Sequence, residues 1–139
     1  MKGEVYYLDA NVLIPIIESP HRLTTSQRSF VAGLESGAVK GLTSELTLTE
    51  CLVKPLADRD GTAVKAFLTL LNDQPELPVV PVSRSVLLEA ARLRAEDSLE
   101  LADAIHVATA KLSGCSVFLS DDRRIRPSSE LAVSSWTGL

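Results

Sequence analysis

The chain has 139 residues, a length typical of one domain that buries a sufficient core without disulfide bonds or structural metals. Apolar residues make up 45% of it and charged residues 23%, as in ordinary globular proteins, while aromatic residues make up only 4%, so the core must be aliphatic. The formal net charge of −4 means that the chain as a whole lacks the basic footprint of most nucleic-acid-binding proteins. Such a role would need a local basic patch, or cations bound among clustered acids.

The two cysteines, Cys51 and Cys115, stand in apolar surroundings and are interpreted as reduced packing residues. Their spacing to the histidines does not indicate a zinc site. The first residues lead directly into an apolar run without a signal-peptide pattern, and no apolar run approaches the roughly 20 residues that span a bilayer. We therefore expect a single soluble domain over residues 1–139, located in the cytoplasm.

The run from Val5 to Ile14 predicts a buried strand near the N-terminus, and it is interrupted by Asp9 and Asn11. Because a buried carboxylate is costly unless it is paired, hydrogen-bonded or bound to a metal, Asp9 is expected at the end of the strand. In an open α/β sheet that carboxyl end is where ligands bind. The alternative is that Asp9 or Asn11 only caps the helix that follows.

Predicted helices and strands alternate along the rest of the chain, after an irregular patch expected around Glu18 between Pro15 and Pro20. A proline inside the third predicted strand favours an edge position or a strand end. The alternation predicts a three-layer α/β/α fold with a mostly parallel central sheet. The predicted helices are 24–37, 44–56, 63–71, 83–93 and 101–112, and the further strands are 39–43, 79–82, 115–120 and a short one around 133–136.

Further acids lie beside apolar segments, and each has an ordinary explanation. Glu50, at the margin of an apolar helical stripe, could be a solvated glutamate. Asp103 could simply favour the N-terminus of the buried helix that contains it. Asp121 and Asp122 close a buried strand and could form a polar turn.

Taken together, these acids indicate a shared site. Two positions, Asp9 and the Asp121–Asp122 pair, follow buried strands, and two lie on helices that a parallel sheet would bring to the same edge. Several carboxylates in one place repel unless a positive group lies between them. A hard divalent cation with oxygen ligands is the usual answer, and such a site suits phosphodiester hydrolysis.

Four segments, in this order, resemble the PIN domain family. They are Tyr7–Leu13, Leu42–Ser44 leading to Glu50, Leu101–Ala110 and Val117–Arg124, so the resemblance covers most of the chain. Small single-domain proteins of this kind resemble the toxin halves of VapBC-type toxin–antitoxin pairs. The resemblance implies an endoribonuclease that depends on one or two Mg²⁺ or Mn²⁺ ions.

The resemblance also implies roles for individual residues. Asp9, Asp103 and Asp122 are expected to ligate the metal, directly or through water. Glu50 is expected to bind a second metal or to orient the attacking water. Asn11 and Ser120 fall on polar positions that would orient ligands or the scissile phosphate. The family more often has asparagine where this chain has Asp121, so that residue could itself bind metal or make the role of its neighbour ambiguous. The four family acids are Asp9, Glu50, Asp103 and Asp122.

Basic residues beside the last acid are candidates for RNA phosphate contacts, namely Arg123, Arg124 and Arg126. The alternative for them is surface solubility or salt bridges to nearby acids. His106 is interpreted as a packed core residue rather than as a base. The resemblance further implies a homodimer, and a cognate antitoxin whose C-terminal segment covers the site with an arginine or lysine among the carboxylates.

Three other functions remain open from the sequence. A receiver-like phospho-acceptor domain would have adjacent acids after the first strand and a late lysine, whereas here the adjacent pair comes late and arginines follow it. A haloacid-dehalogenase-like phosphatase would have an aspartate where this chain has Asn11. A non-catalytic PIN-like binding module is the third, although all four acidic positions are present.

Overall fold

The computed structural model describes residues 3–128 and 130–139. They form a five-stranded sheet with the strand order β3-β2-β1-β4-β5, and every pair of neighbouring strands is parallel. The expected α/β architecture with a parallel sheet is therefore confirmed, and the sheet is parallel throughout. The strands are β1 Val5–Leu8, β2 Lys40–Ser44, β3 Val79–Val80, β4 Val117–Leu119 and β5 Ala132–Ser134.

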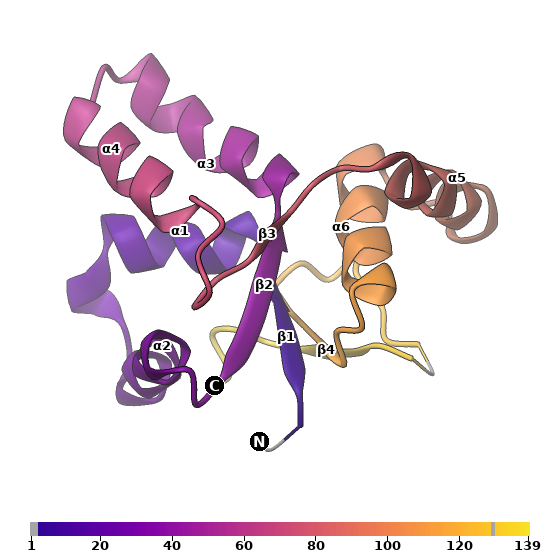
Figure 1. The fold of residues 1–139 in the computed structure, drawn as a ribbon, viewed down its shortest axis with the longest axis horizontal. Coiled ribbons are helices and arrows are strands. Elements are labelled where there is room, and N and C mark those ends of the chain that lie inside the picture. Colours follow the sequence, from indigo (N-terminus) through magenta and orange to yellow (C-terminus); the bar gives the residue numbers. More distant parts are fainter. Residues whose placement is uncertain (1–2, 129) are drawn as a thin grey trace.

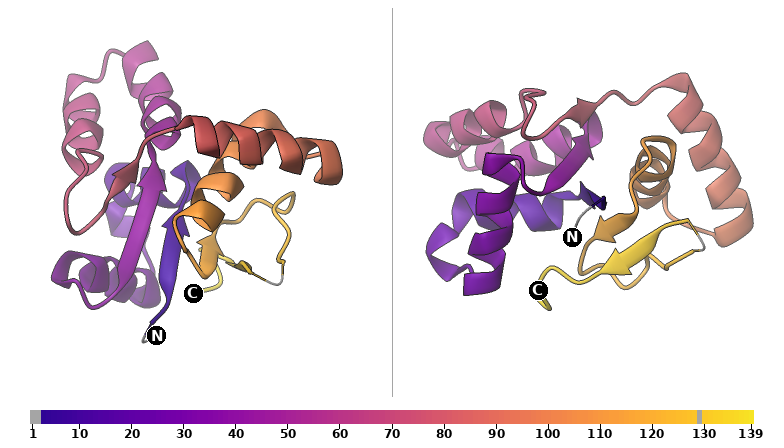
Figure 2. Two further views of the ribbon diagram at one scale, coloured as in Figure 1. Left: turned by 45° about the vertical axis from the view of Figure 1, so that its right-hand side comes forward. Right: turned by 60° about the horizontal axis from the view of Figure 1, so that its bottom comes forward.

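Helices cover both faces of the sheet (Figure 1). One face carries the helices of the first half of the chain, and the other carries α5 and α6 (Figures 1 and 2). The strands alternate accordingly, since Leu8 packs in the core of the first face and the neighbouring Tyr7 in the core of the second. In the described ranges the helices are α1 Ala10–Glu18, α2 Thr25–Ser36, α3 Glu45–Ala57, α4 Gly61–Leu70, α5 Arg84–Asp97 and α6 Leu101–Leu112, with a 3₁₀ turn at Pro20–Arg22.

Local signals set most helix starts. The Thr24 hydroxyl accepts from the backbone N–H of Gln27, whose side chain accepts from the backbone N–H of Thr24, so a capping box opens α2. Ser44 caps α3, as expected, and Ser83 rather than Ser85 caps α5. At the other end of α2, Gly37 takes a left-handed conformation with φ of 81°, which glycine adopts without steric cost.

The prolines confirm one expectation and correct another. Strand β3, which Pro81 follows, lies at the edge of the sheet, as the proline predicts. The irregular patch expected around Glu18 is wrong, because α1 continues through Pro15 to Glu18. A helical proline forfeits one backbone hydrogen bond, and here the burial of Val12 and Leu13 in the core offsets that loss.

Hydropathy along the helices agrees with this packing. Within the described ranges, no helix combines the length and the apolar character that crossing a membrane requires.

Both cysteines are buried as free thiols, and burial raises the pKa of Cys51 and of Cys115 to about 12, so both are protonated packing residues, as expected.

Candidate functional site

The site begins at the carboxyl ends of two neighbouring strands, the central strand β1 and β4 beside it. Leu8 of β1 pairs with Leu119 of β4, so the residues that follow, Asp9 and Ser120, leave the sheet side by side. The Ser120 hydroxyl donates a 2.6 Å hydrogen bond to Oδ2 of Asp9, and its oxygen accepts a 3.0 Å hydrogen bond from the backbone N–H of Asp122. One serine therefore links the acid after β1 to the acid after β4.

Asp9 is buried, with 7% of its surface exposed. It occupies the N-cap position of α1, but its side chain makes no capping hydrogen bond, so the alternative of a simple helix cap is wrong for the carboxylate. Burial raises the pKa of Asp9, against the lowering effect of the Ser120 hydrogen bond. The carboxylate is thus held in a place that disfavours its charge.

Asp103, in the first turn of α6, meets Asp122 through the side chain of Arg124. Nη2 of Arg124 lies 2.9 Å from Oδ2 of Asp122 and 3.5 Å from Oδ2 of Asp103, and Nη1 lies 3.1 Å from Oε2 of Glu100. Burial, and then the charge of Asp122, raise the pKa of Asp103, whereas the Arg124 hydrogen bond lowers the pKa of Asp122. A guanidinium of the same chain therefore offsets part of the repulsion between these acids.

Two carboxylate oxygens at this edge are buried without a hydrogen-bond partner among the described residues, Oδ1 of Asp9 and Oδ2 of Asp103. The second of these has only the 3.5 Å approach of Arg124, which is an ion pair too long for a good hydrogen bond. Buried polar atoms are nearly always satisfied, because an unsatisfied one costs its full desolvation penalty. Each of these oxygens therefore lacks the partner that a bound cation would supply.

Glu50, the second family acid along the chain, comes from α3, and its side chain is one-third exposed at the same edge. Its Oε1 lies 2.7 Å from Nε2 of His106, and Nδ1 of that histidine lies 2.5 Å from the hydroxyl of Tyr7. His106 is buried, as expected of a packed residue, but both of its ring nitrogens make specific contacts. The signal that could have revealed this is its spacing of three residues from Asp103, which places the two side chains on one face of α6.

The two adjacent aspartates after β4 point in different directions. Oδ1 of Asp121 accepts from Ser135 Oγ at 2.7 Å and from the N–H and hydroxyl of Thr137, each at 3.2 Å, so this carboxylate holds the segment after β5. Asp122 is the one that contacts the Arg124–Asp103 pair. The geometry therefore favours Asp122 as the fourth family acid, and metal binding by Asp121 stays a prediction that its contacts do not support.

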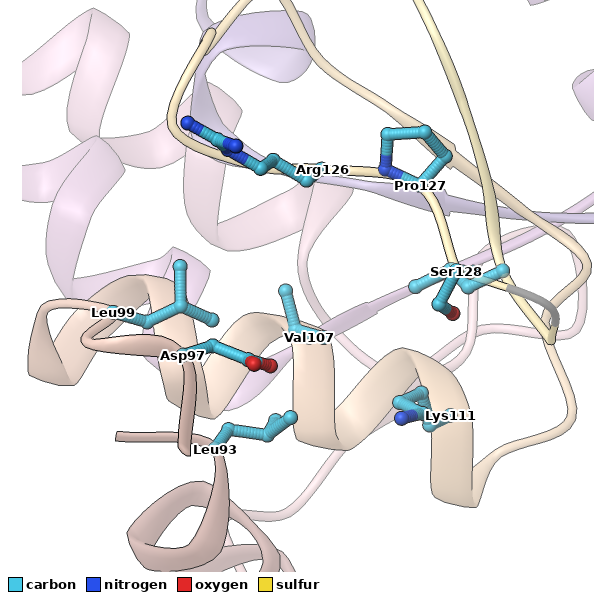
Figure 3. A pocket seen from close by; sticks show the side chains of 9 residues that line it. Leu93, Asp97, Leu99, Val107, Lys111, Arg126, Pro127 and Ser128 are labelled. Atoms are coloured by element: carbon cyan, nitrogen blue, oxygen red, sulfur yellow. The ribbon is translucent and has the colours of Figure 1, made fainter. Parts of the chain in front are cut away.

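The remaining predicted residues divide between different surfaces. Asn11 is exposed on the first turn of α1, and Arg123 is exposed beside the acids. Arg126 instead lines a cavity of about 570 Å³ between α5, α6 and the loop that follows β4, together with Lys111 and Asp97 (Figure 3). Neither the four acids nor Arg123 and Arg124 line this cavity, so Arg126 faces a different surface from Arg124, which contacts the acids.

As the side chains stand, no group of three histidine, cysteine, aspartate or glutamate residues within residues 3–128 and 130–139 is arranged to hold a metal ion. Two of these acids instead pair with a guanidinium, since Arg124 contacts both Asp103 and Asp122, and one oxygen of Glu50 is taken by His106. A metal bound by the aspartates would therefore have to replace the guanidinium as their positive partner.

A comparison with protein-family models decides the family, since the one described as PIN domain matches residues 6–128. The chain belongs to the PIN domain family. PIN domains are typically metal-dependent nucleases, which agrees with the acids at the edge of this sheet. Membership excludes the receiver-like and phosphatase alternatives and leaves the non-catalytic PIN-like module. A separate comparison of the chain with curated proteins finds no match.

Several solved structures share this fold, and one of them is described as a toxin–antitoxin complex. FitAcB from Neisseria gonorrhoeae is similar with a TM-score of 0.72 and 18% identity over 96% of this chain and 99% of that one. VapBC2 from Rickettsia felis, bound to a DNA fragment from its promoter, has a TM-score of 0.71 and 15% identity over 95% and 98%. A toxin–antitoxin complex from Klebsiella pneumoniae has a TM-score of 0.68 and 19% identity over 91% and 95%. At these identities the likeness establishes the fold of this PIN domain.

Proposed function

We propose that this PIN domain is an endoribonuclease that hydrolyses RNA phosphodiester bonds with the help of one or two Mg²⁺ or Mn²⁺ ions. The observation that carries the proposal is the pair of buried carboxylate oxygens without a hydrogen bond, Oδ1 of Asp9 and Oδ2 of Asp103. Hard divalent cations prefer oxygen ligands, and Mg²⁺ uses few carboxylates and keeps several waters. Unpaired carboxylate oxygens beside a partly exposed glutamate suit that preference.

Asp9, Asp103 and Asp122 would hold the ion, directly or through water. When bound, it would supply a water of lowered pKa and offset negative charge on the scissile phosphate and the departing 3′-oxygen. Ser120 holds Oδ2 of Asp9, which leaves Oδ1 for the ion. Three aspartates from β1, α6 and the end of β4 thus share one cation-binding role.

Glu50 is the acid that we assign to the water or to a second ion. Its Oε1 is engaged by His106, so Oε2 is the oxygen left to orient the attacking water or to accept its proton. Asn11, exposed beside Asp9, would position ligands or the scissile phosphate through hydrogen bonds. RNA phosphates would be contacted by exposed arginines, with Arg123 beside the acids and Arg126 at the neighbouring cavity.

We propose further that the protein acts in the cytoplasm as the toxin of a toxin–antitoxin pair. One of the similar structures is described as a toxin–antitoxin complex, and VapBC2, whose name matches the VapBC-type pairs that the sequence resembles, has the same fold. A cognate antitoxin would restrain the nuclease by covering the acids with an arginine or lysine of its own. A homodimer is part of the same proposal.

The test is incubation of the purified protein with total RNA, with Mg²⁺ or Mn²⁺ and with EDTA, followed by mapping of the new 5′ ends. We expect cleavage at defined sites with metal, none with EDTA, and none by the Asp9→Asn variant. Asp121→Asn is the matched control, because it changes a neighbouring aspartate whose carboxylate faces away from the cluster.

Each alternative gives a different result. Cleavage that persists in EDTA or in the Asp9→Asn variant would contradict the proposal. A folded protein that binds metal or a protein partner but never cuts RNA would be the non-catalytic PIN-like module. Hydrolysis of small phosphomonoesters, without cleavage of RNA, would indicate a different substrate class.

A further inference from the structure

A chain of three side chains from different elements runs from the core to the acidic edge. The hydroxyl of Tyr7 on β1 lies 2.5 Å from Nδ1 of His106 on α6, and Nε2 of that ring lies 2.7 Å from Oε1 of Glu50 on α3. Tyr7 is fully buried and the His106 side chain is 5% exposed, while the Glu50 side chain is 33% exposed. The three side chains thus connect a fully buried core residue to the most exposed of the four family acids.

The chemistry of the donors sets the direction of these hydrogen bonds. An ionised carboxylate only accepts, so the proton between His106 and Glu50 belongs to Nε2. In a neutral imidazole the other nitrogen, Nδ1, is then an acceptor. In that tautomer the hydroxyl of Tyr7, 2.5 Å away, donates to Nδ1.

We propose that His106 is a positioning residue for Glu50, and that Tyr7 holds the imidazole in the orientation and tautomer that this task requires. A glutamate has several rotatable bonds, and an unanchored one at the surface samples many rotamers. One fixed oxygen, Oε1, leaves the other oxygen at a defined place beside the aspartates. The inference rests on the proposed function, because it assigns a purpose to the orientation of Glu50.

Simple core packing does not explain the arrangement. Apolar residues surround this part of α6, such as Ile105 and Val107, and an apolar side chain at position 106 would fill the same space. A buried imidazole instead needs partners for both nitrogens, and it finds them in side chains 99 and 56 residues away. Outer hydrogen-bond partners of this kind, in metal sites, typically change affinity or activity by roughly 10- to 100-fold when they are removed.

The experiment compares two substitutions of similar size at position 106. The amide nitrogen of Gln in His106→Gln can take the place of Nε2 and donate to Glu50. The shorter Asn in His106→Asn can replace only Nδ1 and reach Tyr7. Thr109→Val is the packing control, since Thr109 is buried on the same helix and its hydroxyl donates only to the backbone of α6, at Ile105. Thermal unfolding of each variant checks that it folds.

In single-turnover cleavage of RNA at saturating Mg²⁺, we expect His106→Asn to lower the rate constant by roughly 10- to 100-fold, with little change in RNA affinity. His106→Gln should stay within a few-fold of the wild type, and so should Thr109→Val. In a Glu50→Gln background, His106→Asn should have no further effect, because its role passes through that carboxylate. Equal rates for all position-106 variants, or an undiminished effect in the Glu50→Gln background, would overturn the inference.

A second measurement needs neither metal nor RNA. The imidazole ¹⁵N spectrum of the metal-free protein should report the Nε2–H tautomer for His106, and Tyr7→Phe should shift or broaden those signals. The side-chain ¹³C signal of Glu50 should change in His106→Asn but not in Thr109→Val. An Nδ1–H tautomer would refute the inference. If the wild-type protein cuts no RNA, the proposed function fails, and these spectra still decide whether His106 holds Glu50.

Discussion

Ser120 and Asp9, 111 residues apart in the chain, are joined by a 2.6 Å hydrogen bond at the ends of two paired strands. The bond satisfies one oxygen of a buried carboxylate and leaves the other without a partner among the described residues. The hydrogen bond from Ser120 therefore orients the Asp9 carboxylate, while Oδ1 of Asp9 still lacks a hydrogen bond. Predictions about metal, pH and the neighbouring acids follow from this incomplete satisfaction.

Ser120→Ala should destabilise the protein, because it removes a hydrogen bond to a buried charged group and leaves both Asp9 oxygens unpaired. Bonds to charged groups contribute roughly 1.5–3 kcal/mol, and a loss within that range is expected from urea unfolding. Ser29→Ala, at an exposed position of α2, is the control and should change the free energy of unfolding little. A Ser120→Ala protein as stable as the wild type would argue against the bond.

The stability of the metal-free protein should depend on pH through Asp9. Since burial raises the pKa of Asp9 in the folded state, the folded protein binds this proton more tightly than the unfolded chain does. The stabilisation that comes from this bound proton is complete at pH values below the pKa of Asp9 in the unfolded chain. It is lost as the pH rises through the higher pKa of Asp9 in the folded protein. At neutral pH, Asp9→Asn should therefore unfold at a higher temperature than the wild type, with the difference vanishing in acid.

Added Mg²⁺ should reverse that ranking. The wild-type protein should gain thermal stability with metal concentration, because a ligand that binds only the folded state stabilises it. The Asp9→Asn variant should gain little, since it lacks the carboxylate. Melting curves at increasing Mg²⁺, with Ca²⁺ and Na⁺ as ionic controls, provide the measurement. A gain that is the same in both proteins would place the metal elsewhere.

Arg124→Gln should strengthen metal binding several-fold. The guanidinium of Arg124 is the positive partner of Asp103 and Asp122 in the absence of metal, so a cation must compete with it. Isothermal titration with Mn²⁺ measures the change in dissociation constant, and Arg123→Gln, at the exposed neighbouring position, is the matched control. Weaker binding by Arg124→Gln than by Arg123→Gln would mean that Arg124 supports the site rather than competing for it.

The adjacent aspartates should respond differently to substitution. Asp122→Asn should reduce RNA cleavage by roughly 10- to 100-fold or more, because we assign Asp122 to the metal, directly or through water. Asp121→Asn should leave cleavage largely intact and instead loosen the segment after β5, where its carboxylate accepts from Ser135 and Thr137. Hydrogen exchange of the Thr137 amide reports that loosening. The reverse pattern would exchange the two roles.

The sequence by itself determined the fold class and the candidate acids. Periodic apolar residues, capping hydroxyls and a proline at a strand end act over a few residues, so they can be identified without coordinates. An acid directly after an apolar strand, such as Asp9, must lie near the edge of a parallel sheet because the chain leaves the core there. The resemblance to PIN domains rests on short segments in a fixed order, which can also be read without coordinates, and the family match confirms it.

Only the tertiary structure decided which partner each of these side chains contacts. Asp121 and Asp122 are indistinguishable in sequence, and their divergence depends on where β5 returns beside β4. Likewise, Arg124 faces two acids rather than solvent, and His106 contacts a residue 56 positions away. Such contacts depend on the relative placement of elements distant in the chain, which packing of the whole core sets and which no local pattern encodes.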